Sequence, residues 1–473
     1  MKRILIALVG ILNVAGLDAQ HQDLSEKSAL WQGEKRQLED STSLLYAFRK
    51  GQMHGHFRYF FMATDNSSGL TDYYANAVGG GVKYETAPFY GFQFGVSGFF
   101  VYNIGSSDLV KPDPATSQAN RYEVGLFDLT DPDNKSDIDR LEELYLKYRH
   151  KGTQIIFGKQ QINTPFINLQ DGRMRPTNIG GLYAEIHEWK KTKLDAGIFY
   201  QISPRSTVAW YKIGESIGLY PQGVNTEGTR SDYAGNIESK GVALLNLSHD
   251  INKNIKIRLS DLFVENVFNS LLLQVDFSFP VSERSKWITA VQMIRQDAVA
   301  DGGNTDPAKA YFSRNGHSQT FGALVGWQGS RWSGSMNYNR INSAGRYLMP
   351  REWGRDPFFT FLPRERNEGL GDVHAFVLKT GYKIPKIRLK AEAAIGYYDL
   401  PSVTNYRLNK YGMPSYGQLN LDLRYEFSGF LKGFDTQLLF VHKTKTGNSF
   451  GNDRYVINKV DMSVWNLVVN YHF

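Results

Sequence analysis

The sequence predicts an all-β protein, a transmembrane antiparallel β-barrel of 18 strands. Three observations support this prediction. Strand-like segments repeat with a period of two, apolar on one face and charged on the other. Many segments reach the roughly ten residues that a tilted strand needs to cross the hydrocarbon layer. Very short and longer connections alternate along the chain, as in single-chain barrels of the bacterial outer membrane.

The composition is compatible with one large barrel. The chain has 473 residues, no cysteine, a formal charge of +7 and 14% aromatic residues. Without cysteine it can form neither disulfides nor thiolate metal sites. Its basic residues are spread along the chain, whereas a nucleic-acid binder gathers them on one surface. We therefore expect no nucleic-acid partner.

The N-terminus has the pattern of an export signal. Two basic residues precede an apolar run at 4–12, and Ala19 offers a cleavage point. The run is far shorter than the roughly 20 residues of a membrane-spanning helix. We assign three regions: a signal peptide at 1–19, an N-terminal extension facing the periplasm at 20–50, and the barrel at 51–473.

Eight short turns and nine longer connections separate the predicted strands. An even number of strands places both termini on the periplasmic side, so the longer connections face outward. We expect these connections near 66–72, 104–139, 161–178, 202–237, 265–269, 297–316, 343–372, 400–415 and 447–458. The fourth is the least regular, because 207–211 has a strand-like composition that extends into it.

The period of two also predicts which side chains face the bore. In the last strand Trp465, Leu467, Val469, Tyr471 and Phe473 share the apolar face, which meets lipid in a membrane barrel. The same parity directs a set of basic side chains inward: Arg58, Lys256, Arg258, Arg388, Lys390 and Arg424. Two interpretations stay open. The set forms a ladder that concentrates anions, or its members pair with interior acids such as Asp422, Glu392 and Glu426.

The third long connection, 161–178, combines charged and apolar residues. Most loops are solvated, yet this one carries Phe166, Ile167, Leu169 and Met174. We expect these four to pack against the inner wall, so that the loop narrows the bore. Its charged residues are Asp171, Arg173 and Arg175. They form a filter for carboxylates, which the arginine fork binds bidentately, or an Asp–Arg pair that holds the loop in place.

The seventh connection, 343–372, offers further pore candidates, because Arg351 and Arg355 lie there among aromatic residues. The acid-rich segment 128–139 could hold calcium, but it lacks the spacing of a calcium loop. A solvated loop with Asx turns is the better interpretation. No catalytic or phosphate-binding motif is present. We therefore expect no enzyme activity, no metal and no cofactor.

Several segments carry a family resemblance: RYFFMATDN at 58–66, LTDYYANA at 70–77, NRYEVGLFD at 120–128, RLEELY at 140–145, GKQ at 158–160, TPFINLQDGRMRP at 164–176 and SPRST at 203–207. They resemble the OprD family of substrate-specific outer-membrane porins, most closely its Bacteroidetes-type branch. The resemblance implies an 18-stranded barrel, monomeric or loosely trimeric. Its third loop folds inward with help from the seventh, and a basic ladder guides solutes that carry a carboxylate.

On these grounds we expect a passive porin of the bacterial outer membrane. The expected solutes are small, anionic or zwitterionic molecules with a carboxylate, such as amino acids, organic acids and short peptides. The apolar last strand ending in Phe473 resembles the signal that the outer-membrane assembly machinery reads. The alternative is an adhesin or receptor barrel with a closed bore.

Overall fold

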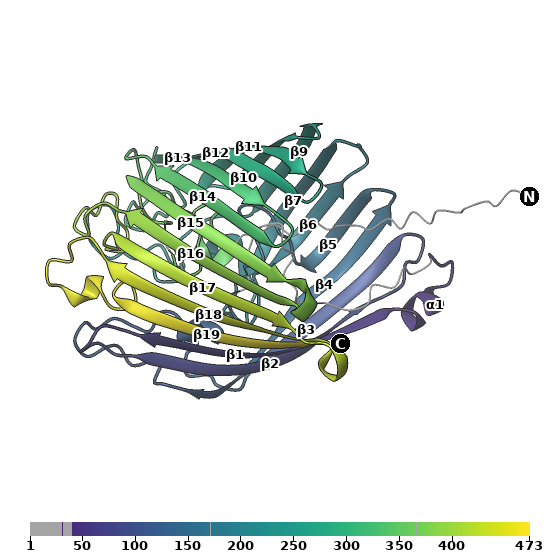
Figure 1. The fold of residues 1–473 in the computed structure, drawn as a ribbon, viewed down its shortest axis with the longest axis horizontal. Coiled ribbons are helices and arrows are strands. Elements are labelled where there is room, and N and C mark those ends of the chain that lie inside the picture. The colour runs from purple at the N-terminus through teal and green to yellow at the C-terminus, as the bar shows by residue number, and fades with distance from the viewer. Residues whose placement is uncertain (1–30, 32–39, 171, 366) are drawn as a thin grey trace, which may run out of the picture.

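The computed structural model describes Trp31 and residues 40–170, 172–365 and 367–473. The expected signal peptide at 1–19 lies outside the described residues. So do Asp171, Arg366 and residues 20–39 of the expected extension except Trp31. The described part of the chain forms a tilted barrel with long connections at one end, here the loop end, and short turns at the other, the turn end (Figure 1).

The described strands form one closed antiparallel sheet. It contains 19 strands, and β1 pairs with both β2 and β19. The two-residue β8, Tyr211–Lys212, pairs only with β7, and β7 pairs directly with β9. Eighteen strands therefore make the barrel wall, as predicted, and β8 lies in the loop where strand-like residues were expected.

The wall strands are β1 Gln52–Asp65, β2 Tyr73–Glu85, β3 Phe92–Ser106, β4 Ile138–His150, β5 Thr153–Gln160, β6 Asn178–Ile186, β7 Thr192–Ser203, β9 Val242–Asn252, β10 Ile255–Val264, β11 Phe268–Ser282, β12 Ser285–Ala298, β13 His317–Gln328, β14 Trp332–Ile341, β15 Val373–Ile384, β16 Leu389–Asp399, β17 Tyr416–Glu426, β18 Phe434–Lys445 and β19 Met462–His472. Short helices occupy connections: α1 Leu44–Arg49, α2 Ile213–Ser216, η2 Glu123–Leu126, η3 Arg351–Trp353, η4 Pro385–Ile387, η5 Gly429–Leu431 and η6 Asp453–Tyr455.

The predicted parity of the strands holds in β17 and β19. Trp465 is 45% exposed on the outer face, whereas its neighbour Asn466 is 3% exposed toward the bore. Leu421 and Asp422 differ in the same way, at 43% and 1%. An apolar outer face and a polar inner face suit a barrel in lipid. Among the described residues, no helix has the length and apolar character needed to cross a membrane.

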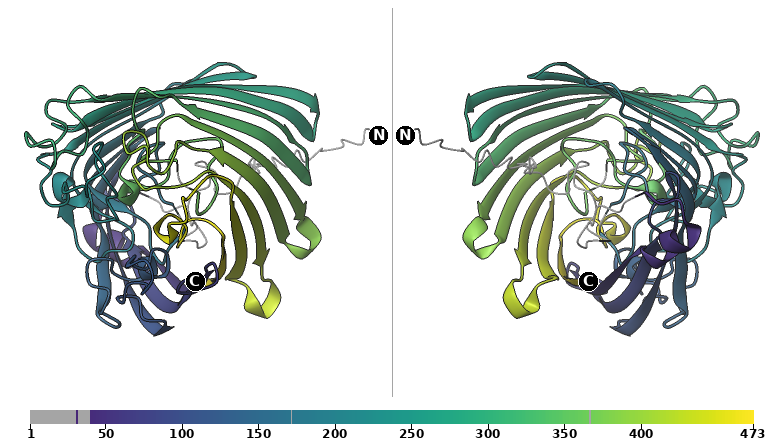
Figure 2. Two further views of the ribbon diagram at one scale, coloured as in Figure 1. Left: turned by 90° about the vertical axis from the view of Figure 1, so that its left-hand side faces the viewer. Right: turned by 90° about the vertical axis from the view of Figure 1, so that its right-hand side faces the viewer.

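The core of the protein lies inside the barrel, because loops fold into the bore. Both end views show loop segments within the ring of strands (Figure 2). Phe166 and Ile167 of the third loop share a buried cluster with Trp353 of the seventh loop. Met174 joins a second cluster with Phe60 and other residues of the wall. The predicted inward packing is thus present for these three apolar residues, while Leu169 is only half-buried and belongs to neither cluster.

One inward-facing residue was predicted wrongly. Parity places Arg388 on the lumen-facing side of a strand. The structure places it in the turn before β16, where it is exposed and has a left-handed φ of 54°. Pro385 begins the short helix η4 there, since proline lacks the N–H that a strand ladder needs. Arg388 instead donates to the backbone oxygen of Phe427 at 3.3 Å, at the turn end of the barrel.

Candidate functional site

A β-bulge in β4 points two successive carboxylates into the barrel. Ser97 pairs with Glu143, whereas the next residue, Gly98, pairs with Leu141. Glu142 is therefore the extra residue of the bulge, which breaks the alternation of inward and outward side chains. Both Glu142 and Glu143 are buried. The bulge supplies a buried acid to which a loop arginine can bind.

Arg175 of the third loop binds this acid. Its Nε donates to Glu142 Oε1 at 2.7 Å, and its Nη2 binds the second oxygen of the same carboxylate. Nη1 lies 3.1 Å from Nδ1 of His56 on β1, and the guanidinium carbon lies 4.1 Å from the ring centre of Phe99 on β3. Arg140 also donates to Glu142, at 2.8 Å. Arg175 thus fixes the loop to three wall strands.

Arg173 has a different environment. Its backbone oxygen accepts from Nη1 of Arg58 at 2.8 Å, so this wall arginine also supports the loop. Among the described residues, the Arg173 side chain donates to the backbone oxygen of Gly172, and its buried Nε has no hydrogen-bond partner there. Burial, together with the nearby cations Arg364 and Arg205, holds the pKa of Arg173 well below its ordinary value. Three arginines from three loops therefore lie near one another, with Glu123 as a nearby buried acid, and an additional anion would offset the remaining excess of positive charge.

The third and seventh loops are joined by a clasp centred on Asn168. Its Nδ2 donates to the backbone oxygen of Arg355 at 2.9 Å, and its Oδ1 accepts from the Arg355 N–H at 3.0 Å. Its own N–H donates to the Trp353 oxygen at 3.1 Å. The loop after β7 joins the same unit, because Trp353 Nε1 donates to Ser216 Oγ at 3.0 Å. The clasp holds the inward loops as one body across the bore.

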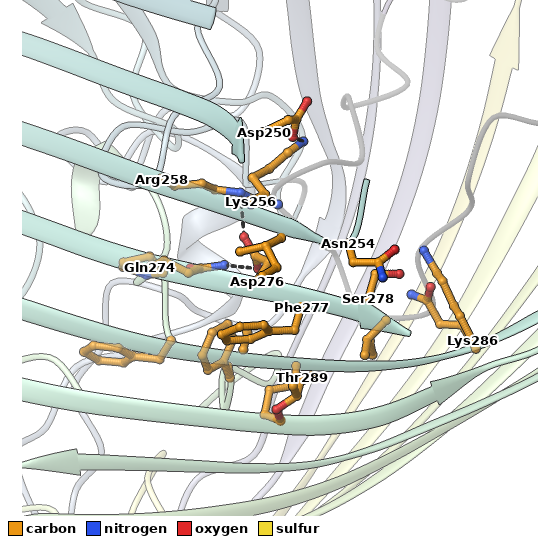
Figure 3. A pocket seen from close by; sticks show the side chains of 18 of the residues that line it. Asp250, Asn254, Lys256, Arg258, Gln274, Asp276, Phe277, Ser278, Lys286 and Thr289 are labelled. Carbon is orange, nitrogen blue, oxygen red and sulfur yellow. Dashed lines mark hydrogen bonds and ion pairs between the residues drawn. The ribbon is translucent and has the colours of Figure 1, made fainter. Parts of the chain in front are cut away.

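A cavity of about 800 Å³ lies between the seventh loop and the wall. Strands β9 to β13 and β15 form its wall, and the loop contributes Arg355 to Phe359 and Phe361. Asn252, Lys253 and Asn254 also line it, so the cavity lies toward the turn end (Figure 3). Seven basic side chains line the cavity against three acidic ones. Its seven bases are Lys191, Lys253, Lys256, Arg258, Lys286, Arg355 and Lys379.

Two of the basic side chains on the cavity wall form ion pairs with acids, but the acids are too few to neutralise all seven bases. Arg258 Nε lies 3.0 Å from Asp276 Oδ2, and Lys256 Nζ lies 3.3 Å from Asp250 Oδ1. The Arg258 side chain remains 48% exposed in its pair, so it can also meet a solute. Lys286 lies further along the same wall (Figure 3). The cavity therefore keeps a surplus of positive charge.

The remaining predicted residues lie apart from this cavity. Arg351 is 3.3 Å from Glu368 and donates to the Pro221 oxygen at 2.8 Å, within the loop bundle. Arg424 faces inward on β17 and pairs with Asp422 at 3.2 Å, as the pairing alternative expected. Asp171 lies outside the described residues. The structure thus groups Arg58, Arg173 and Arg175 at the third loop and Lys256, Arg258 and Arg355 at the cavity.

The described residues contain no group of three or more His, Cys, Asp or Glu side chains arranged to hold a metal. In the acid-rich loop, Asp128 accepts from the Thr130 N–H at 2.8 Å. Asn134 accepts from the Asp137 N–H at 3.0 Å. These are the expected turns closed by Asx side chains.

Sequence reasoning did not single out Glu142, Arg205 or Lys286, and it did not bring Arg364 of the seventh connection together with Arg173. Two adjacent glutamates within an alternating strand were a signal of the bulge at Glu142. Lys286 obeys the parity of β12 and could have joined the inward set. No local pattern marks Arg205 or Arg364, since their proximity to Arg173 comes from the packing of three separate loops.

Comparisons with known proteins agree with this architecture. A family model described as OprD, outer membrane porin, matches residues 48–355. No curated protein sequence is similar enough to match the chain. Solved structures show the fold at 13–14% identity: Pseudomonas aeruginosa OccD3 (OpdP), with TM-score 0.68 over 92% of this chain and 94% of that one, and P. aeruginosa OpdK with vanillate, with TM-score 0.68 over 90% and 99%. Acinetobacter baumannii OccAB2 has a TM-score of 0.70 over 90% and 99%, at 13% identity.

Proposed function

The chain belongs to the OprD family of outer membrane porins, and from this premise we propose that it conducts small solutes bearing a carboxylate by passive diffusion. A member of this family is a channel of the bacterial outer membrane and not an enzyme. The proposal concerns the selectivity of the bore. The solutes are anionic or zwitterionic, such as organic acids, amino acids or short peptides. Its place in the Bacteroidetes-type branch stays a prediction.

The cationic cavity is the observation that supports this selectivity most. A cleft with low-dielectric walls and one sign of excess charge raises the local concentration of the opposite ion. The excess here is seven bases over three acids. Aromatic side chains Phe358, Phe359 and Phe361 form part of the same lining. The cavity can therefore receive the charged group of a solute on the wall and its apolar part beside the loop.

The arginine cluster at the third loop supports the same solute class. Arg173, Arg205 and Arg364 repel one another, and a carboxylate entering between them would offset that repulsion. Conduction requires that such binding stay weak enough for release. One structural relative, OpdK, was solved with vanillate, an anion with a carboxylate. We assign Arg173 as the third-loop arginine that meets the solute and Arg175 as the one that holds the loop.

A test uses two copies of the same tripeptide. Lys-Ile-Arg occurs at 256–258 on β10, facing the cavity, and at 386–388 in an exposed turn. Lys256→Gln with Arg258→Gln removes two positive charges from the cavity and leaves Asp250 and Asp276 without their ion-pair partners. We expect uptake of succinate into proteoliposomes to fall about tenfold, because the attracting field is reduced.

Uptake of succinamide, the neutral diamide, should stay at the wild-type rate in the same variant. The matched control, Lys386→Gln with Arg388→Gln, makes the same chemical change outside the bore and should alter neither solute. An equal loss of succinate and succinamide uptake would indicate a blocked bore instead of lost selectivity. Unchanged succinate uptake in the β10 variant would contradict the proposal.

A further inference from the structure

The short helix α1 exposes apolar side chains at the turn end of the barrel (Figure 1). Leu44, Leu45 and Phe48 are 56%, 61% and 47% exposed, whereas Ala47 is buried. The helix is fixed to the barrel, because the Ala47 backbone oxygen accepts from the Ala87 N–H at 2.9 Å, in the turn after β2. An exposed apolar patch of this kind marks a site of contact with lipid or with another surface.

The helix lies beside the lipid-facing side of the wall. On β2 the exposed side chains of Tyr74 and Val82 point outward, and Tyr84 has the same parity. The Tyr84 hydroxyl donates to the backbone oxygen of Phe48 at the end of α1. The apolar side chains of α1 therefore continue the apolar outer face of the barrel, which meets lipid.

The turns beside α1 form one surface with it through hydrogen bonds. The Arg149 N–H donates to the Gly91 oxygen at 2.9 Å, which joins the turn before β3 to β4. The His187 N–H donates to the Gly152 oxygen at 3.1 Å, which joins the turn after β4 to the turn after β6. We call this surface the platform, and it consists of residues 44–50, 86–91, 151–152 and 187–191.

The platform carries an excess of positive charge. Its one acid, Glu188, accepts from the Gly152 N–H at 3.1 Å and from the Thr153 hydroxyl at 2.9 Å. The bases are exposed, and within the part of the chain that the structure describes none of them forms an ion pair. The acid-rich segment 128–139 lies at the opposite, loop end. The five bases of the platform are Arg49, Lys50, Lys151, Lys190 and Lys191.

Aromatic side chains locate the platform relative to the bilayer. Phe92 and Tyr148 lie opposite each other on β3 and β4, with 4.8 Å between ring centres. Trp189, within the platform itself, is exposed. Such residues gather where the lipid chains meet the headgroups. Lys151 follows Tyr148 by three positions, at most about 10 Å along a strand, so the platform lies at the level of the headgroups.

We propose that the platform binds anionic phospholipid of the periplasmic leaflet, with α1 inserted beside the acyl chains and the bases bound to the phosphate groups. Basic side chains near a membrane surface attract anionic headgroups, and a helix with exposed apolar residues lies in this interface. The apolar patch and the positive charge thus meet the two parts of one lipid molecule. The proposal goes beyond the selectivity of the bore.

Native mass spectrometry of the full chain released from detergent tests the choice of lipid. In an equal mixture of phosphatidylglycerol and phosphatidylcholine with the same chains, we expect the wild type to retain more of the anionic lipid. Lys151→Gln with Lys190→Gln should lower this preference about fivefold or more, because two charges that meet the headgroups are lost. The matched control is Lys111→Gln with Lys240→Gln, which removes two exposed lysines at the loop end and should keep the preference.

The absence of cysteine allows a separate test of the position of α1. A nitroxide on Leu45→Cys, in vesicles of the same two lipids, reports whether the helix is in lipid or in water. We expect it to collide more often with oxygen, which dissolves in lipid, than with a water-soluble nickel chelate. The same label on Ser136→Cys, in an exposed loop at the loop end, should show the reverse.

Either measurement can overturn the proposal. An unchanged lipid preference in Lys151→Gln with Lys190→Gln would rule out binding of the anionic headgroup. A label at position 45 that meets the nickel chelate more than oxygen would place α1 in water, and a label shielded from both would show that protein covers the helix. Should the double variant fail to fold, Lys190→Gln against Lys240→Gln makes the same comparison.

Discussion

Two arginines two positions apart in the third loop have different surroundings. Arg175 binds Glu142 through two nitrogens, and both side chains are buried. Arg173 forms no hydrogen bond or ion pair with a carboxylate of the described residues, and it lies near Arg205 and Arg364. A buried ion pair that loses one member leaves an uncompensated charge. Removing a buried cation that lies among like charges eliminates their repulsion and so does not destabilise the fold in the same way.

This contrast gives a prediction at the residue scale. Arg175→Ala should lower the free energy of unfolding by about 1–3 kcal/mol, because the buried Glu142 keeps its ion pair with Arg140 but loses its hydrogen bonds to Arg175. Arg173→Ala should leave that free energy unchanged or raise it, while reducing the preference for anions. Urea unfolding in lipid vesicles measures the first effect, and the reversal potential in a salt gradient measures the second.

Arg314→Ala serves as the stability control, because the Arg314–Asp301 pair is exposed, at 77% and 33% for the two side chains. Such a surface pair contributes about 0–1 kcal/mol. Equal stability losses for Arg173→Ala and Arg175→Ala would contradict the division of roles.

The same short sequence can lie in a strand at one position and in a turn at another. Lys-Ile-Arg-Leu occurs twice, at 256–259 and 386–389, and parity treats both copies alike. Arg258 does face the bore, but Arg388 lies in a turn. The difference comes from Pro385, which ends the ladder of β15. The side chains that face the bore could be predicted where strands are regular. Pairing of inward bases with interior acids, as in Arg424 with Asp422, could be stated as one of two alternatives.

At the scale of elements, strands and loops differ in how far the sequence predicts them. Each wall strand pairs with its neighbours in the chain, apart from the closing pair β1–β19, so alternation and turn spacing locate it. The clasp between the third and seventh loops joins Asn168 to Arg355, 187 residues apart. No local pattern contains that contact. The inward course of the third loop could be predicted from its apolar residues, but its partners could not.

The clasp leads to the prediction at this scale. Asn168→Ala removes the side chain that bonds both the N–H and the oxygen of Arg355. Each buried group left unpaired costs about 1–3 kcal/mol. The two loops should separate more often, which would appear as more frequent current fluctuations in single channels.

Asn134→Ala is the matched control, because the side-chain hydrogen bonds of Asn134 in the described part of the chain stay within its own exposed loop. It should leave the current trace unchanged. Quiet single-channel currents from Asn168→Ala would show that the clasp does not hold the constriction.

At the scale of the whole molecule, the barrel closes between its first and last strands. Gly55 and Phe473 exchange backbone hydrogen bonds of 2.8 and 3.1 Å. A side chain at position 55 would collide with the Phe473 ring, since a Cβ there would lie 1.9 Å from it. Recognition of Phe473 by the assembly machinery, and a monomer or loose trimer as the assembled form, stay predictions.

The protein is an outer-membrane channel whose inward loops carry arginines and whose cavity carries excess positive charge. The most direct test is the reversal potential of the purified wild-type protein in a planar bilayer under a KCl gradient. We predict an ion current whose reversal potential has the sign of chloride selectivity. This selectivity should decrease as ionic strength rises, because salt screens the field of the basic side chains. A cation-selective current would contradict the cationic bore, and the absence of any current would favour a closed receptor or adhesin barrel.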